Sequence, residues 1–180
     1  MDQTFHAPDA LDASSTQQLV QELKGCIRNV DHVAIAVPDL EAAIDWYTGK
    51  LGFRVVERRI TRGKRTAMLS AVVIAAGVVV VLIQGTEPES QVSRFVTAFG
   101  PGVQHIAFGV EDLEHAMSRA IAAGAVADTP VIGDEGIRQV FLKRDSASGV
   151  RVELIERKGG EFTDKSVDRL FRAFEDNDLY

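Results

Sequence analysis

The chain has 180 residues, 46% apolar and 26% charged, which is typical of one globular domain and excludes a disordered chain or two large domains. Acidic residues outnumber basic residues by 26 to 20, and no lysine/arginine run supplies the basic surface of a general nucleic-acid binder. The single cysteine, the absence of an apolar run long enough to span a bilayer, and an N-terminus without the pattern of a secretory signal lead us to expect a cytoplasmic protein without membrane or nucleic-acid partners.

The first 28 residues are predicted to form an arm and one helix that precede the core. Residues 1–13 are polar and acidic. Ser14 or Ser15 is a suitable N-cap for a helix that ends near Lys24, before Gly25.

An internal repeat follows this arm. Residues 30–44 read VDHVAIAVPDLEAAI, and residues 103–117 read VQHIAFGVEDLEHAM. At this offset of 73, eight of fifteen positions are identical, and three more exchange one apolar residue for another. Each copy predicts a strand and then a helix, which Asp39 or Asp112 caps. The chain is therefore expected to contain two copies of one supersecondary unit.

Three strand-like segments follow each of these helices, separated by turns that contain glycine. Each unit is thus predicted to be βαβββ, in an α+β domain at 29–160 with modules at about 29–88 and 102–158. A connecting helix is predicted over 89–99, and apolar residues at helical spacing predict a further helix in the tail, 161–180. The predicted strands are 54–60, 66–75 and 78–84 in the first unit and about 125–131, 138–144 and 150–157 in the second.

Two histidines occupy the same position in both repeats. His32 and His105 lie inside apolar strands, and two strands related by pseudo-twofold symmetry would bring the imidazoles together. A lone buried histidine is more often a hydrogen-bonded core residue, but a symmetric pair favours metal ligation.

Glu153 is the candidate for a third ligand. It lies in the last strand of the second unit, VRVELIE, where a carboxylate is costly unless it is paired or bound to metal. An ion pair with Arg151 or Lys143 on an exposed face is the alternative. With both histidines, Glu153 would complete the 2-His-1-carboxylate set that leaves open positions on non-haem Fe(II). The corresponding strand of the first unit, VVVVLIQG, offers no fourth ligand, since Val81 occupies that place.

These features resemble the vicinal oxygen chelate superfamily, which includes glyoxalases, methylmalonyl-CoA epimerases and 4-hydroxyphenylpyruvate dioxygenases. The resemblance covers about residues 29–176 and implies paired βαβββ modules in a curved mixed sheet around one metal. The segments GPGVQHIAF, RQVFLKR, VELIERKGGEF and LFRAFE are most similar to the dioxygenase catalytic domain. The methylmalonyl-CoA epimerase is the second match, on NVDHVAIAVPDLEAAIDWYTGKLGF.

The dioxygenase resemblance implies specific roles. His32, His105 and Glu153 would bind Fe(II), with Co, Ni, Mn or Zn as other candidate ions. The partners would be O₂ and a small substrate, a 2-oxo acid or similar chelating molecule, and a homodimer fits this superfamily. The tail helix would act as a gate. The residues implied to line the substrate pocket are Gln91, Gln104, Gln139, Phe162 and Ser70.

Two other functions remain open. A metal-dependent epimerase or isomerase would stabilise an enolate, although the sequence RTAMLSAVV has no carboxylate where the epimerase family carries its acid/base glutamate. A metal-free protein that binds a small molecule and confers resistance would not need the His/His/Glu set. Departures from the dioxygenase pattern, with Thr86 and Ser166 in place of asparagines, leave the identity of the substrate open.

Overall fold

The computed structural model describes residues 27–133, 136–159 and 164–176. Most of the predicted arm and its helix therefore lie outside the described residues, as does Phe162. The elements are β1 (Asn29–Ala36), α2 (Leu40–Leu51), β2 (Arg54–Arg62), β3 (Ala67–Ala75), β4 (Val78–Gly85), α3 (Gln91–Phe99), β5 (Gly102–Val110), α4 (Leu113–Ala122), β6 (Ile132–Gly133), β7 (Ile137–Phe141), β8 (Arg151–Arg157) and α5 (Asp164–Asp176).

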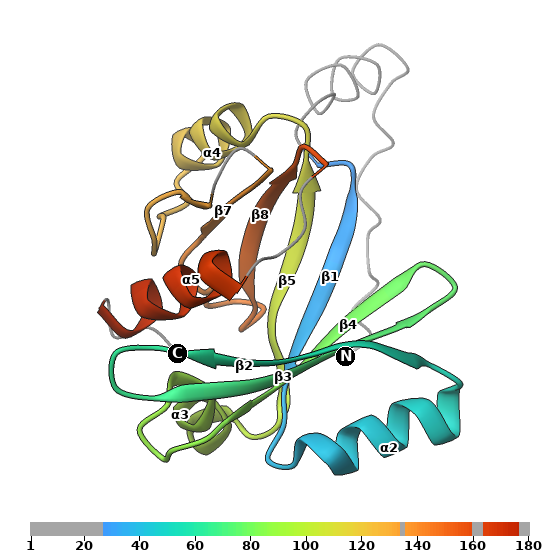
Figure 1. Cartoon of the computed structure of the whole chain (residues 1–180). Coiled ribbons are helices and arrows are strands. Elements are labelled where there is room, and N and C mark those ends of the chain that lie inside the picture. Colours follow the sequence, from blue (N-terminus) through green and yellow to red (C-terminus); the bar gives the residue numbers. More distant parts are fainter. Residues whose placement is uncertain (1–26, 134–135, 160–163, 177–180) are drawn as a thin grey trace, which may run out of the picture.

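One curved mixed sheet contains all the described strands, in the order β2-β3-β4-β1-β5-β8-β7-β6 (Figure 1). The two β-strands of the repeat, β1 and β5, pair antiparallel at its centre, and each pairs parallel with the last strand of its own unit, β4 or β8. This arrangement confirms the α+β fold and the two βαβββ units. It also places the two repeated histidines on adjacent strands.

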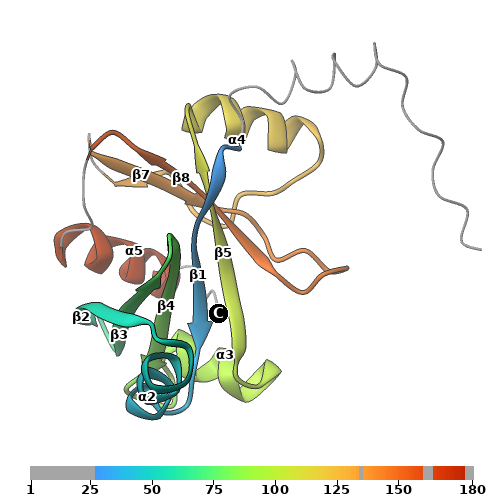
Figure 2. The ribbon, with the colours of Figure 1, turned by 90° about the vertical axis from the view of Figure 1, so that its right-hand side faces the viewer.

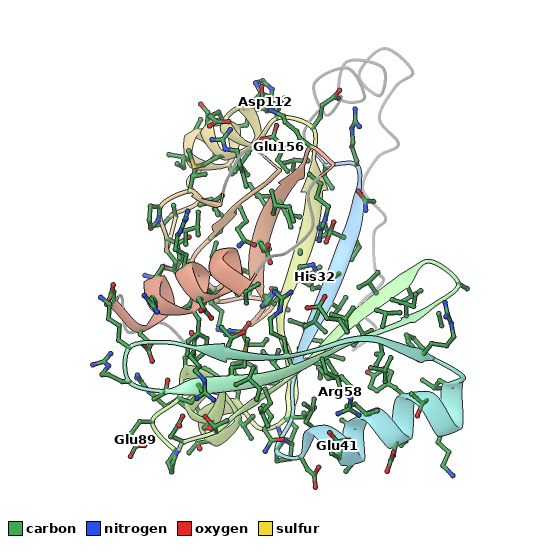
Figure 3. The ribbon with its side chains drawn as sticks, in the orientation of Figure 1. His32, Glu41, Arg58, Glu89, Asp112 and Glu156 are labelled. Atoms are coloured by element: carbon green, nitrogen blue, oxygen red, sulfur yellow. The ribbon has the colours of Figure 1, made fainter. Side chains whose placement is uncertain are left out.

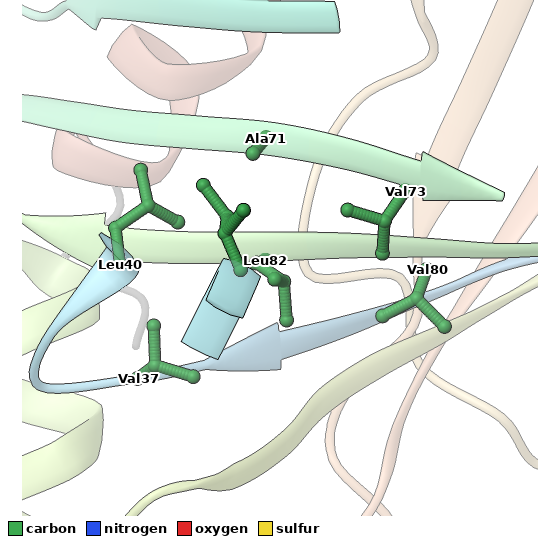
Figure 4. Close-up of a cluster of buried hydrophobic side chains, with 7 residues drawn as sticks. Val37, Leu40, Ala71, Val73, Val80 and Leu82 are labelled. Carbon is green, nitrogen blue, oxygen red and sulfur yellow. The ribbon is translucent and has the colours of Figure 1, made fainter. Parts of the chain in front are cut away.

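Successive residues of β3 and β4 point alternately to the two faces of the sheet in the first unit. One set packs against α2 and forms an apolar core, which Figure 4 shows in close-up. The opposite set faces the concave side of the sheet and lines a pocket there. Because both faces are buried, these strands read as nearly continuous apolar runs. The core on the α2 side consists of Val37, Leu40, Ile44, Ala71, Val73, Val80 and Leu82.

The second unit repeats this packing with α4. Asp39 and Asp112 cap α2 and α4 in the same way: Asp39 accepts a hydrogen bond from the Ala42 N–H (3.0 Å), and Asp112 accepts one from the His115 N–H (2.9 Å). Leu113 and Leu154 are buried in the core beneath α4. The equivalence of the two helices confirms the repeat as a structural unit.

The predicted strand at 125–131 is wrong in extent. This segment makes one isolated bridge, between Ala127 and Leu142, and the strand β6 begins only after it, at Ile132. Pro130 has no N–H to donate to a ladder, which explains why pairing does not continue through it. The following strand also ends earlier than predicted, at Phe141.

Helix α5 lies on the concave side of the sheet, between its two halves, whereas α2 and α4 lie on the other side (Figures 1 and 2). Its apolar residues Leu170, Phe171 and Phe174 line the pocket, as their helical spacing predicted. Within the described residues, no helix is both long and apolar enough to cross a bilayer.

Candidate metal centre and its pocket

Three side chains from adjacent strands meet on the concave face of the sheet. In the strand register, His32 of β1 and Glu153 of β8 both pair with Ala107 of β5, whose small side chain leaves space between them. His105 Nε2 lies 3.3 Å from both His32 Nε2 and Glu153 Oε2, and His32 Nε2 lies 3.5 Å from the same carboxylate oxygen. Ligand atoms that share one ion at about 2.1 Å have separations of this size. Figure 3 shows His32 near the middle of the sheet.

A β-bulge precedes each histidine. The register between β1 and β5 shifts between Val30 and His32 and again between Ala34 and Ile35, which leaves Asp31 and Gln104 without a cross-strand partner. A bulge can redirect the side chain of its extra residue. Asp31 and Gln104 accordingly reach the Nδ1 atom of the histidine that follows each of them in the chain.

These contacts define how the histidines are oriented. Asp31 Oδ1 lies 2.9 Å from His32 Nδ1, and the side-chain oxygen of Gln104 contacts His105 Nδ1. An ionised carboxylate and an amide oxygen can only accept, so each Nδ1 carries the proton. Each Nε2 therefore directs its lone pair toward Glu153, as in metal-bound histidines.

The protonation states of the cluster fit metal ligation. Burial raises the pKa of Glu153 to about 7, an effect that the nearby His32 only partly offsets. Burial, with the adjacent charges of Arg151 and Arg144, lowers the pKa of His105 to about 3 and so keeps this imidazole neutral. Glu153 is 1% exposed, and its Oε1 has no hydrogen-bond partner among the described residues. A buried carboxylate between two imidazole lone pairs is the donor set that a divalent ion would satisfy.

The raised pKa predicts a pH-dependent stability of the metal-free protein. Between 4.5, the ordinary pKa of this group, and about 7, the folded protein retains a proton on Glu153 that the unfolded chain has lost. The free energy of unfolding should therefore fall as pH rises through this window. Glu153→Gln, which is neutral at every pH, should be more stable than the parent above pH 7, by on the order of 3 kcal/mol, but not near pH 4. Denaturant titrations of both proteins in a chelator check this, and a difference that does not change with pH contradicts it.

The three residues of the cluster line a pocket with a cavity volume of about 130 Å³. Four of the five side chains expected to bind substrate line this pocket: Ser70, Gln91, Gln104 and Gln139. Gln139 is 1% exposed, and neither of its amide atoms has a hydrogen-bond partner within the described part of the chain. Such a buried amide facing a cavity is suited to orienting a ligand. The fifth, Phe162, lies outside the described residues.

The wall that the first unit contributes is mainly apolar. Val72 of β3 and Val81 and Ile83 of β4 face the pocket, so the described part of this wall holds no fourth ligand beside the cluster. Polar residues of this unit occur further from β1, at Ser70 and at the ion pair between Glu57 and Arg59 on β2 (2.6 Å).

The buried carboxylate of Glu175 joins the C-terminal part of α5 to the first unit. Glu175 accepts hydrogen bonds from the Lys64 N–H (2.5 Å) and from both the N–H (2.9 Å) and the hydroxyl (2.7 Å) of Thr66, all in the turn between β2 and β3. Gly63 permits this approach, because a Cβ there would collide with the carboxylate. Burial alone would raise the pKa of Glu175, but these hydrogen bonds lower it below its ordinary value.

Asp31 and Glu175 were not predicted from the sequence. A signal for Asp31 was present, because it occupies the same repeat position as Gln104, directly before a histidine. For Glu175 the signal was weaker: a carboxylate at the C-terminal end of a helix opposes the helix dipole and so calls for a partner.

Comparisons with known proteins agree with this architecture. The sequence model of the Glyoxalase/Bleomycin resistance protein/Dioxygenase superfamily matches residues 29–154. The mitochondrial methylmalonyl-CoA epimerase of Dictyostelium discoideum is 30% identical over 136 residues, which are 73% of this chain and 80% of that protein. The ethylmalonyl-CoA/methylmalonyl-CoA epimerase of Cereibacter sphaeroides is 31% identical over 132 residues, 71% of this chain and 97% of that protein.

A solved structure extends the similarity of fold. A mutant of 4-hydroxymandelate synthase from Streptomyces coelicolor superposes with a TM-score of 0.73, covering 84% of this chain and 55% of that one at 22% identity. At this identity the likeness concerns the fold alone. The matched family model and the two curated relatives together show that the chain belongs to the Glyoxalase/Bleomycin resistance protein/Dioxygenase superfamily.

Proposed function

We propose that the chain is a metal-dependent enzyme that binds a small substrate through two oxygen atoms to one divalent ion. The observation that carries this proposal is the convergence of His32, His105 and Glu153, whose ligand atoms lie 3.3–3.5 Å apart in a buried site. A structural metal site would be closed by a fourth protein ligand, which the apolar wall at Val81 does not offer.

The residues of the chain have distinct roles in this proposal. A divalent ion, when bound, supplies a Lewis acid with open coordination positions. His32, His105 and Glu153 hold it, and the amide of Gln139 orients the substrate. Phe171 and Phe174 of α5 exclude water from the pocket. A cavity of about 130 Å³ admits a small acid or the reactive end of a larger molecule.

For the reaction, the pocket itself supports an Fe(II)-dependent dioxygenase acting on a 2-oxo acid. Three protein ligands leave the positions that such an enzyme needs for substrate and O₂. Decarboxylation of the 2-oxo acid would supply two electrons to O₂, with one oxygen atom entering the new carboxylate and the other the rest of the substrate. The chain would contribute orientation and exclusion of water and would not need an acid/base carboxylate, which the wall formed by Val72, Val81 and Ile83 lacks.

The second candidate is a metal-dependent epimerase, which the curated relatives favour over the dioxygenase. Both relatives quoted above are methylmalonyl-CoA epimerases by name, at 30% and 31% identity. In this reaction the ion would stabilise an enolate while a side chain moves the proton. Apart from Glu153, Glu57 is the carboxylate among the described pocket residues that could do so, but it is paired with Arg59.

Oxygen dependence separates the two reactions. The protein would be freed of metal, loaded with Fe²⁺ or Co²⁺ without oxygen, and offered a panel of 2-oxo acids or methylmalonyl-CoA. The dioxygenase predicts O₂ uptake with Fe²⁺ and one 2-oxo acid and no turnover under anaerobiosis. Epimerisation of methylmalonyl-CoA by the anaerobic Co²⁺ protein would contradict the dioxygenase and establish the second candidate. Binding without turnover under every condition would contradict both. Glu153→Gln is the control for adventitious metal in either assay.

A further inference from the structure

The two histidines are equivalent by the repeat, but their Nδ1 atoms contact different kinds of partner. His105 contacts the neutral amide of Gln104, whereas His32 contacts the carboxylate of Asp31. Both partners are the extra residues of β-bulges, so the backbone arrangement is the same in the two units. The difference between the histidines is therefore one of charge.

Asp31 is itself fixed by an arginine from another strand. Arg157 of β8 donates from Nε to Asp31 Oδ2 (2.6 Å) and from a terminal nitrogen to Oδ1 (2.8 Å). This two-pronged geometry restricts the carboxylate more than a single hydrogen bond would. The side chain of Asp31 is 13% exposed, so the interaction is shielded from solvent on that side.

The strand order explains how Arg157 reaches Asp31. β5 lies between β1 and β8, so an interaction between the outer two strands must cross it. Alternation places Arg157 on the same face of β8 as Glu153. The residues of β5 on this face, beyond His105, are Ala107 and Gly109, and neither carries a side chain larger than a methyl group.

We infer that Asp31 and Arg157 are positioning residues for the metal centre, and that they make His32 the more firmly oriented and more strongly donating of its two imidazole ligands. This inference rests on the proposed function, because it requires an ion at the cluster. A carboxylate that accepts the Nδ1 proton of a metal-binding histidine fixes the ring and increases its basicity. A neutral amide, as at His105, orients the ring with less effect on its basicity.

The competing explanation is that Asp31 and Arg157 form an ion pair that only joins β1 to β8. Stability alone does not separate the two explanations, because either predicts some loss when the pair is broken. Metal affinity and the visible absorption of bound Co²⁺ do separate them, since both respond to the donor strength and orientation of His32. Asp31→Asn is the informative variant, because its side-chain oxygen can still accept from Nδ1 but the charge is gone, which reproduces the neutral partner of His105.

The experiment compares the parent protein with Asp31→Asn, Arg157→Ala and Arg157→Lys. Co²⁺ would be titrated against a competing chelator, and the absorption spectrum recorded at saturation. We expect Asp31→Asn and Arg157→Ala to weaken Co²⁺ binding by about 10–100-fold and to shift the absorption bands, with Arg157→Lys in between. Arg58→Ala is the matched control. It breaks another arginine–carboxylate pair, with Glu41 (3.0 Å), that lies away from His32 (Figure 3), and it should leave affinity and spectrum unchanged.

His105→Ala separates failure of this inference from failure of the proposed function. If the parent binds one Co²⁺ and His105→Ala does not, the metal site stands. In that case, parental affinity and an unchanged spectrum in Asp31→Asn and Arg157→Ala would overturn the positioning role, even if both variants melt at lower temperature. If neither the parent nor His105→Ala binds Co²⁺, the proposed function fails and this inference falls with it.

Discussion

Replacing Glu153 by glutamine, or His105 by alanine, should abolish stoichiometric binding of one divalent ion and lower turnover by a factor of about 10³ or more. The reason is geometric: each residue supplies one of three ligand atoms that lie 3.3–3.5 Å apart, and two remaining protein ligands bind a divalent ion weakly. Glutamine has nearly the shape of glutamate, so the variant should fold. Metal content by mass spectrometry and turnover at saturating substrate are the measurements.

Glu156→Gln is the matched control for this prediction. Glu156 lies on the same strand and is equally buried, but it pairs with Arg138 and Lys158 and not with the histidines. We expect this variant to lose some stability and to retain one bound ion. Loss of the ion in Glu156→Gln, or full activity in Glu153→Gln, would show that the cluster does not act as the metal site.

The second large effect is expected at α5, whose apolar residues line the pocket. Glu175→Ala should release the C-terminal part of α5 from the turn between β2 and β3, because Lys64 and Thr66 lose the acceptor of three hydrogen bonds. We expect a loss in the free energy of unfolding on the order of 2–4 kcal/mol. With the pocket open to water, kcat/KM should fall by roughly 10–100-fold, while affinity for the ion is retained.

Asp176→Asn tests whether this effect belongs to Glu175. Asp176 also links α5 to Lys64, through the side-chain ammonium (2.7 Å), but both side chains are about half exposed. Exposed pairs of this kind contribute about 1 kcal/mol or less. Equal losses of stability in the two variants, or loss of the ion in Glu175→Ala, would contradict the role assigned to Glu175.

The repeat explains why so much of the fold was predictable from the sequence. The same strand and helix patterns occur twice at a fixed offset. The element boundaries predicted in one unit can therefore be compared with those predicted in the other. The same repeat singled out His32 and His105, and a carboxylate at an alternating apolar strand singled out Glu153. In each case a polar or ionisable side chain stands in a strand whose apolar neighbours predict burial. Such a conflict is expected at a functional position.

The residues that support the site were harder to predict because they depend on contacts between distant segments. A β-bulge is a register shift between two strands, and no local pattern in either strand reveals it. Gln104 illustrates the difference: its position in the pocket was expected, but its contact with His105 depends on the bulge. The contact of Glu175 with Thr66 joins residues 109 positions apart, and the short β6 reflects the interruption at Pro130.

Membership of the superfamily determines the fold of the chain but leaves its reaction open. The curated relatives are epimerases by name, whereas the part of the pocket wall at Val72 and Val81 holds no acid/base carboxylate. Both reactions begin with two substrate oxygens bound to one ion. The two proposed reactions therefore differ in the side chains that they require around that common centre.

Anomalous diffraction from a crystal grown with Fe²⁺ under anaerobic conditions tests the central claim most directly. Data on either side of the iron absorption edge would locate iron without reference to the activity. We expect one strong peak at about 2.0–2.3 Å from His32 Nε2, His105 Nε2 and a carboxylate oxygen of Glu153. A map with no peak among these three side chains, or with its strongest peak elsewhere on the chain, would contradict it.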